Sequence, residues 1–144
     1  MNLKLLSSDY FYDPSFKMKV IERDPELPYP LHSHDFFELV VIVSGKGTHY
    51  TVANSFSLLP GNVFVITPGL EHGYRDVENL RLYNILFDIK LFDEAFFDLR
   101  NMPGYHALLR IEPNYRNDVG ISTLMQLTPA QMAEIVPLLE HMQL

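Results

Sequence analysis

The sequence predicts a mainly β domain, either a sandwich or a small barrel, that is followed by a C-terminal helix. Two observations support this prediction. Between residues 16 and 89, short runs rich in β-branched and aromatic residues alternate with glycine and proline turns. After residue 127, a helix-start signal precedes apolar residues at helical spacing. The length of 144 residues suits one compact domain with its own core.

Six runs of the sequence have the composition of β-strands. Residues 16–24 alternate apolar and charged side chains, as a half-buried strand does. Residues 36–44 are almost all apolar, which is typical of a strand that is covered on both faces. We expect the glycines of 45–47 to turn the chain after this run, and the proline-rich stretch 25–30 to be an extended loop. The other four strands are expected at residues 48–52, 56–59, 62–67 and 80–89.

The sequence divides into three segments around this core. We expect residues 1–15 to form an N-terminal arm, residues 16–127 to form the barrel, and residues 128–144 to begin a dimerisation helix. The part of the barrel segment after residue 90 is less regular. It predicts a short helix over 91–100 and strands over 105–111 and 121–127.

The last segment carries the clearest helix signal in the chain. Thr128 precedes Pro129, and Gln131 occupies the third helical position, which is a capping-box arrangement with proline at the first position. An apolar seam follows at helical spacing, made of Met132, Ile135, Leu139 and Met142. This seam either mediates self-association or packs on the chain's own barrel. Because the pattern runs to the last residue, we expect the sequence to be a fragment of a longer polypeptide.

The composition excludes several classes of function. The formal net charge is −7 and the basic residues are scattered, so no surface for direct nucleic-acid binding is expected. The absence of cysteine excludes disulfides and thiolate sites. No apolar run is long enough to span a bilayer and the N-terminus is too polar for a signal peptide, so we expect a cytoplasmic protein without membrane contact.

Three side chains of metal-ligand type stand close together around the start of the most apolar strand. Because side chains alternate faces in a strand, His32, His34 and Glu38 project to one side if the strand is regular. His72 follows a later turn and is a candidate fourth ligand. Imidazole and carboxylate groups suit a divalent transition metal such as Zn, Ni, Fe or Mn. Alternatively, the histidines lie on a rim and the carboxylate hydrogen-bonds to a small molecule or to backbone amides.

The same residues resemble a known pair of motifs. The spacing His32-x-His34-x3-Glu38-x6-Gly45 resembles the first conserved motif of the cupins. The second motif is partly kept, since Gly61, Gly69 and His72 fall at its spacing, whereas Thr67 and Asp76 replace its proline and asparagine and Glu26 replaces the leading glycine of the first motif. The resemblance implies that His32, His34, Glu38 and His72 occupy the metal-binding positions of metallocupins.

A narrower resemblance covers residues 16–144. The stretches LPYPLHSHDFFELVVIVSGKGTHYTV, PGNVFVITPGLEHGY and LRLYNILFD are similar to the N-terminal effector-binding and dimerisation domain of AraC-family transcriptional regulators, most of all the rhamnose-responsive members. This implies a cupin-type double-stranded β-helix, a jelly-roll barrel, followed by a C-terminal α-helix. It also implies a homodimer that binds DNA only through a C-terminal domain missing from this chain.

Three roles for the barrel follow from these resemblances. The first is a non-catalytic sensor of a small effector, for which a carbohydrate is the first candidate. Besides the metal-type residues, the polar side chains expected to contact the effector are His49, Tyr74, Tyr83 and Asn84. The second role is a metal-dependent cupin enzyme, such as an oxygenase or an isomerase. The third is a dimerisation scaffold without a polar cavity.

Overall fold

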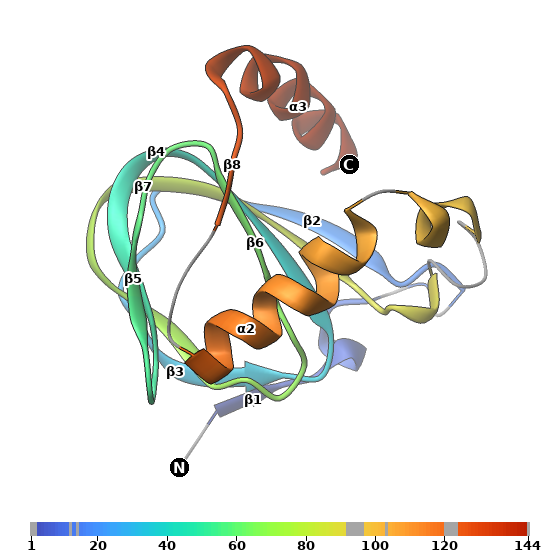
Figure 1. Cartoon of the computed structure of the whole chain (residues 1–144), viewed down its shortest axis with the longest axis horizontal. Helices are drawn as coiled ribbons and strands as arrows, with labels where there is room; N and C mark the ends of the chain where they lie inside the picture. Colours follow the sequence, from blue (N-terminus) through green and yellow to red (C-terminus); the bar gives the residue numbers. More distant parts are fainter. Residues whose placement is uncertain are drawn as a thin grey trace.

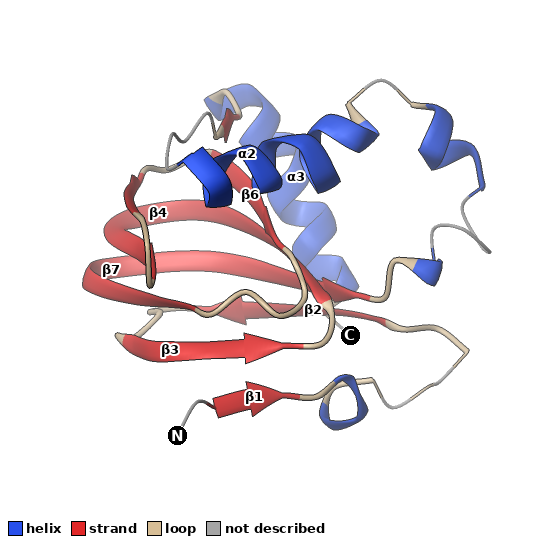
Figure 2. Ribbon diagram, turned by 60° about the horizontal axis from the view of Figure 1, so that its bottom comes forward, coloured by secondary structure: helices blue, strands red, loops and turns tan. Residues whose placement is uncertain are grey.

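The computed structural model of the chain describes residues 3–11, 13, 15–91, 97–102, 104–119 and 124–143. It shows one strongly curved β sheet with helices packed along its outer side (Figures 1 and 2). The strands are β1 (Leu3–Leu5), β2 (Met18–Arg23), β3 (Tyr29–His34), β4 (Phe37–Thr51), β5 (Ser55–Leu58), β6 (Asn62–Ile66), β7 (His72–Phe87) and β8 (Met125–Gln126). The helices are α2 (Glu112–Val119) and α3 (Pro129–Met142), with 3-10 turns at Ser7–Asp9 and Phe97–Asn101 and a π-helical turn at Ala107–Ile111.

Two long strands organise the sheet. β4 and β7 contain 15 and 16 residues and pair antiparallel from Phe37↔Phe87 to Thr51↔His72. β7 also pairs with β2 and β3, and β4 also pairs with β5 and β6. Each long strand therefore has several partner strands along its length. This confirms the expected mainly β, double-stranded β-helix fold with a C-terminal helix. The strand order β1-β3-β7-β4-β6-β8 leaves the sheet open at its ends, so the barrel is not a closed ring of hydrogen bonds.

The expected turn at residues 45–47 is wrong, because β4 continues through it. The pairing of β4 with β7 shifts register between Ile42 and Thr48, which marks a bulged, sharply bent region within one strand. Gly45 has a φ of +81°, and a Cβ at this position would overlap the backbone carbonyl of Asn79. The glycines therefore let the two long strands bend together, instead of reversing the chain.

Three further expectations change in the structure. The predicted strand over 105–111 is wrong, since 107–111 is helical and runs directly into α2; a short apolar run does not distinguish a strand from a buried helix. Within the predicted helix 91–100, residues 92–96 lie outside the described part, and Phe97–Asn101 is a 3-10 helix. Residues 121–123 of the predicted strand 121–127 also lie outside the described part of the chain. Of the remaining residues, Met125 and Gln126 form β8, which pairs with β6.

The expected loop at 25–30 is too long, because its last two residues belong to a strand. Tyr29 and Pro30 belong to β3, which pairs with β7 through an irregular step between Tyr29 and His32. The proline, which has no N–H to donate, lies within this irregular step. As a result, the two histidines of the first motif lie on β3, whereas Glu38 lies on β4, beyond a bend at residues 35–36.

Both faces of the central strands are buried. Val41 and Tyr83 face an outer core cluster that is covered by Leu109 and by the C-terminal helix. Their neighbours in sequence, Val40 and Leu82, face an inner cluster enclosed by the curved sheet. Period-two alternation thus sends successive residues into two separate cores. In the described residues, no helix combines the length and the apolarity needed to cross a membrane.

The C-terminal helix begins at the predicted cap and packs on the chain's own sheet. The Thr128 side chain accepts from the Gln131 N–H, and the Gln131 side chain accepts from the Thr128 N–H, at 3.2 and 2.9 Å. Three residues of the expected dimerisation seam, Met132, Ile135 and Leu139, pack against the outer cluster. These three side chains are therefore engaged within a single chain, while Met142 is exposed. Self-association through α3 stays a prediction.

The first test compares adjacent leucines of α3. Leu139 is 7% exposed and Leu138 is 63% exposed. We expect Leu139→Ala to lower the free energy of unfolding by about 2–4 kcal/mol, because it opens a cavity in the outer cluster. Leu138→Ala, the matched control, is expected to change it by less than about 0.5 kcal/mol. Urea unfolding measures both, and equal effects of the two changes would contradict this packing.

Candidate functional site

Three buried histidine rings are oriented by their own backbone. His32 and His72 each place Nδ1 3.0 Å from the carbonyl oxygen two residues earlier, and His34 places Nδ1 2.6 Å from the carbonyl oxygen two residues later. A carbonyl oxygen can only accept, so each Nδ1 carries a proton and donates it. In the neutral ring, Nε2 is then left with a free lone pair, which is the form in which histidine binds metals.

The sheet brings these rings together from different strands. His32 on β3 and His72 on β7 are direct cross-strand partners, and their ring centroids lie 4.3 Å apart. The turn before β7 is fixed to the end of β3, because the Gly69 N–H donates to the carbonyl of His34 at 2.9 Å. Glu38 arrives from the start of β4. Strand pairing, and not spacing along one strand, thus assembles the site.

Three of the four expected metal ligands converge. Suitable ligand atoms of His34, Glu38 and His72 all lie within 4.8 Å of one another, and all three residues are buried. Glu38 Oε2 is 2.8 Å from His34 Nε2 and 3.9 Å from His72 Nε2. His32 lies beside this group, with its ring tilted by 53° to that of His72, and is not one of the three residues whose ligand atoms converge.

Burial and neighbouring side chains shift the pKa values of Glu38, His72 and His32. Burial alone would raise the pKa of Glu38, but its contact with His34 and the nearby His72 and His32 hold it below its usual value. Burial lowers the pKa of His72 to about 4 and also lowers the pKa of His32. Near neutral pH, the Glu38 carboxylate is therefore ionised and the buried His72 ring is neutral.

The short distance between His34 Nε2 and Glu38 Oε2 requires a positive charge between these two atoms. His34 Nε2 and Glu38 Oε2 are 2.8 Å apart, yet Nε2 has no hydrogen-bond partner in the described chain. A lone pair and a carboxylate oxygen repel at this distance unless a proton or a cation lies between them. Two ligand atoms of one metal ion are roughly 3–4 Å apart, given bonds of about 2.0–2.2 Å. The 3.9 Å between Glu38 and His72 lies in this range, whereas the 2.8 Å between Glu38 and His34 is a hydrogen-bond distance that a bound metal would widen. The group therefore fits a divalent transition metal with two imidazole ligands and one carboxylate.

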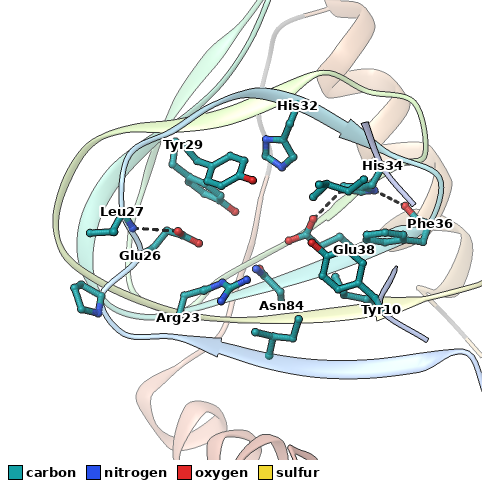
Figure 3. A pocket seen from close by; sticks show the side chains of 15 residues that line it. Tyr10, Arg23, Glu26, Leu27, Tyr29, His32, His34, Phe36, Glu38 and Asn84 are labelled. Atoms are coloured by element: carbon teal, nitrogen blue, oxygen red, sulfur yellow. Dashed lines mark hydrogen bonds and ion pairs between the residues drawn. The ribbon is translucent and has the colours of Figure 1, made fainter. Parts of the chain in front are cut away.

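Two members of the site, His34 and Glu38, line a cavity of about 370 Å³ together with the neighbouring His32 (Figure 3). Cavities of this size hold small molecules. Strands β2, β3, β4 and β7 supply most of the wall, and the N-terminal arm adds Leu5 and Tyr10. The arm is held against the sheet by the parallel pairing of β1 with β3 and by the Ser7 N–H, which donates to the Asp35 carboxylate at 2.6 Å.

The residues expected to contact an effector fall into three places. Tyr74 and Asn84 line the cavity. His49 lies behind the site, stacked on His72 at 5.4 Å, and neither of its ring nitrogens has a hydrogen-bond partner among the described residues. Tyr83 does not line the cavity, because it lies on the outer face of β7 and donates its hydroxyl to Glu22 at 2.7 Å. The period-two alternation of β7 already separates Tyr83 from Asn84.

Sequence reasoning missed two charged residues of the cavity wall, Glu26 and Arg23. In the sequence, Glu26 differs from the glycine of the cupin motif, and its proline-rich loop carries no pattern that indicates burial. The alternation of residues 16–24 places Arg23 on the same face as Ile21, which also lines the cavity, but this face carries Lys17 and Lys19, so the pattern indicates solvent exposure.

The buried histidines predict a pH-dependent stability. Burial lowers the pKa of His32, His49 and His72 in the folded chain, whereas an unfolded histidine titrates near about 6.5. Between these values the unfolded chain binds more protons, so the free energy of unfolding falls as the pH drops from about 6.5 towards about 4. For His72 alone the loss is on the order of 3 kcal/mol.

Urea unfolding in the presence of EDTA measures this loss. His49→Leu is expected to reduce the slope, because it removes one buried titrating ring. His141→Gln, a change at an exposed residue of α3, is the control and is expected to leave the slope unchanged. A free energy of unfolding that is constant between pH 7 and pH 4.5 would contradict the burial of neutral histidines.

Comparison with known proteins is consistent with this architecture. The profile described as "AraC-like ligand binding domain" matches residues 19–136. The HTH-type transcriptional activator RhaR of Pectobacterium carotovorum is 38% identical over 85 residues, which cover 59% of this chain and 30% of that protein. RhaR of Escherichia coli K12 is 29% identical over 139 residues, covering 96% of this chain and 46% of that protein.

Solved structures with a similar arrangement include a cupin-2 domain protein from Shewanella frigidimarina, with 21% identity and a TM-score of 0.42 over 52% of this chain and 72% of that one. The chain spans less than half the length of the RhaR relatives it matches. Since the family profile covers most of the sequence, including every strand from β3 to β8, the chain belongs to the AraC-like ligand-binding domain family.

Proposed function

We propose that this domain senses a small effector in the cavity and passes the signal to a DNA-binding domain elsewhere in a full-length transcriptional regulator. The observation that carries the proposal is the convergence of buried polar side chains on a cavity of about 370 Å³ in a member of this family. This volume suits a monosaccharide-sized molecule. The net charge of −7 is consistent with DNA contact through another domain. Homodimer formation and a cytoplasmic location stay predictions.

Sensing requires that the effector bind one conformation better than another. The cavity wall supports such a preference, because it combines the fixed strands β4 and β7 with the arm residues Leu5 and Tyr10. A ligand that touches both parts stabilises the arm on the sheet. The energy available for switching is the difference in ligand affinity between the docked and the undocked arm.

We further propose that His34, Glu38 and His72 hold a divalent transition metal. The fixed tautomers, the burial and the spacing of the ligand atoms support this proposal. The metal would supply a positive charge and open coordination positions to ligand oxygen atoms in the cavity. The chain's own residues orient the ligands, and all three ligand residues are buried.

Metal binding is tested by titration of the EDTA-treated, dialysed protein with Zn²⁺ and Ni²⁺. We expect about one ion per chain, with His34→Ala and His72→Ala each weakening binding by at least about tenfold. His32→Ala is expected to have the smaller effect, because its ring lies outside the group. His141→Ala is the matched surface control. Equal affinity in all four variants would contradict the proposed site.

The alternative function is a metal-dependent enzyme, such as an oxygenase or an isomerase. The observation in its favour is the group of two histidines and one carboxylate, of which His34 and Glu38 line the cavity; a metal held there would have positions open for a substrate. A sensor and an enzyme differ in what happens to the bound molecule. A sensor returns its ligand unchanged, whereas an enzyme converts it.

Calorimetric titration with L-rhamnose, followed by chromatography of the recovered sugar, separates the two functions. The rhamnose-responsive resemblance of the sequence motivates this sugar. We expect saturable binding with a stoichiometry of about one and complete recovery of the sugar, with and without Zn²⁺. Conversion of the sugar on a timescale of minutes would contradict the sensor and support the enzyme.

A further inference from the structure

One residue outside the group of His34, Glu38 and His72 contacts this group in two ways. The backbone carbonyl of Phe36 accepts the His34 Nδ1–H at 2.6 Å. The Phe36 ring also stacks on the His34 ring, with centroids 4.4 Å apart and planes only 6° from parallel. Phe36 therefore fixes the tautomer of His34 with its backbone and the plane of the imidazole with its side chain.

The ring of Phe36 is packed against the N-terminal arm. It meets the rings of Tyr10 and Phe11 edge to face, with centroid distances of 5.4 and 5.9 Å. Figure 3 shows Tyr10 and Phe36 on the same side of the cavity, beside Glu38. Phe36 is only 3% exposed, although it lies in the bend between β3 and β4 and not within a strand. Because edge-to-face packing is directional, the arm rings restrict the Phe36 ring to one orientation.

The backbone of the arm is attached at the same place. β1 pairs with β3 so that Leu5 is the direct partner of His34. The Leu5 carbonyl accepts the Asp35 N–H at 3.3 Å, and the Asp35 carboxylate accepts the Ser7 N–H at 2.6 Å. The arm thus contacts the segment from His34 to Phe36 through both its backbone and its side chains.

The orientation of a ligand ring affects how tightly a metal binds. A ring that turns freely loses this freedom when the metal binds, and the entropy loss weakens binding. A ring that is already locked by packing avoids the loss. In this chain, the packing that locks His34 comes from Phe36, and the packing that locks Phe36 comes from the arm.

We infer that Phe36 is a positioning residue of the metal site and that the N-terminal arm holds it in place through Tyr10 and Phe11. This inference rests on the proposed metal site and extends that site to the arm. Metal binding and docking of the arm then stabilise each other, because both favour the same orientation of the His34 ring. This coupling needs no effector in the cavity.

The two adjacent phenylalanines provide a matched pair for the test. Phe37 packs against the outer cluster and stacks on Phe87 at 5.5 Å, away from the histidines. In a Zn²⁺ titration of the EDTA-treated, dialysed protein, Phe36→Leu is expected to weaken metal binding by roughly 3- to 10-fold, as expected for a well-oriented aromatic pair. Phe37→Leu is expected to lower the stability and to leave the metal affinity unchanged.

A second variant alters the arm and leaves the barrel intact. Tyr10→Ala/Phe11→Ala is expected to weaken Zn²⁺ binding by a similar factor, although neither residue is a ligand. Leu6→Ala, at an arm residue that is 43% exposed, is the control and is expected to have no effect. Because the coupling is reciprocal, Zn²⁺ is expected to slow the hydrogen exchange of residues 3–11 by a factor of similar size. Mass spectrometry measures this exchange.

A spectroscopic signature separates positioning from general destabilisation. A stacked aromatic ring shields the protons of the ring beneath it, so the ¹H signals of the His34 ring are expected upfield of their position in Phe36→Leu. They are expected to move downfield in Tyr10→Ala/Phe11→Ala, in which Phe36 is still present. Phe36→Tyr, which keeps the aromatic face, is expected to retain both the upfield shift and the Zn²⁺ affinity.

The outcomes distinguish this inference from the metal site on which it rests. Unchanged Zn²⁺ affinity in both Phe36→Leu and the arm variant, or an equal loss in Phe37→Leu, would overturn the role of Phe36 and leave the metal site standing. Hydrogen exchange of the arm that does not respond to bound Zn²⁺ would overturn the coupling in the same way. If the unaltered protein binds no Zn²⁺, the metal site and this inference both fail.

Discussion

The hydrogen bonds from three histidine Nδ1 atoms to nearby backbone carbonyls are the interactions on which the site depends. They hold the rings of His32, His34 and His72 in one tautomer, at distances between 2.6 and 3.0 Å. Because the acceptors belong to the backbone of β3, the following bend and the turn before β7, the ring orientations follow from the fold itself. The sheet therefore presents a preorganised set of lone pairs next to Glu38, without the entropy loss of ordering free side chains.

Strand β2 connects the cavity to the C-terminal helix. Ile21 and Arg23 face the cavity, while Glu22 between them faces outwards and forms an ion pair with Arg81 at 3.3 Å. Arg81 also pairs with Glu140 of α3 at 3.4 Å. A shift of β2 on ligand binding would therefore be transmitted to α3 through the Glu22–Arg81–Glu140 ion pairs and the packing between the two elements. The same strand thus contacts the outer cluster on one face and the cavity on the other.

Local patterns in the sequence predicted the strands, the capped helix and the residue types of the site, and they placed Glu38 and His72 with His34 through a family resemblance. They did not place His32 outside the group, because its position depends on a bend between β3 and β4 that no local pattern marks. The helical course of 107–111 and the cavity role of Glu26 were also missed. Both depend on packing against distant strands, which a single sequence does not contain.

The most direct measurement of the central claim is the tautomeric state of the histidines by two-bond ¹H–¹⁵N correlation NMR, before and after addition of Zn²⁺. The structure predicts protonated Nδ1 in His32, His34 and His72, with the Nε2 signals of His34 and His72 shifting on metal addition and that of His32 shifting less. A neutral Nε2–H tautomer in His34 or His72, with no response to the metal, would contradict the account.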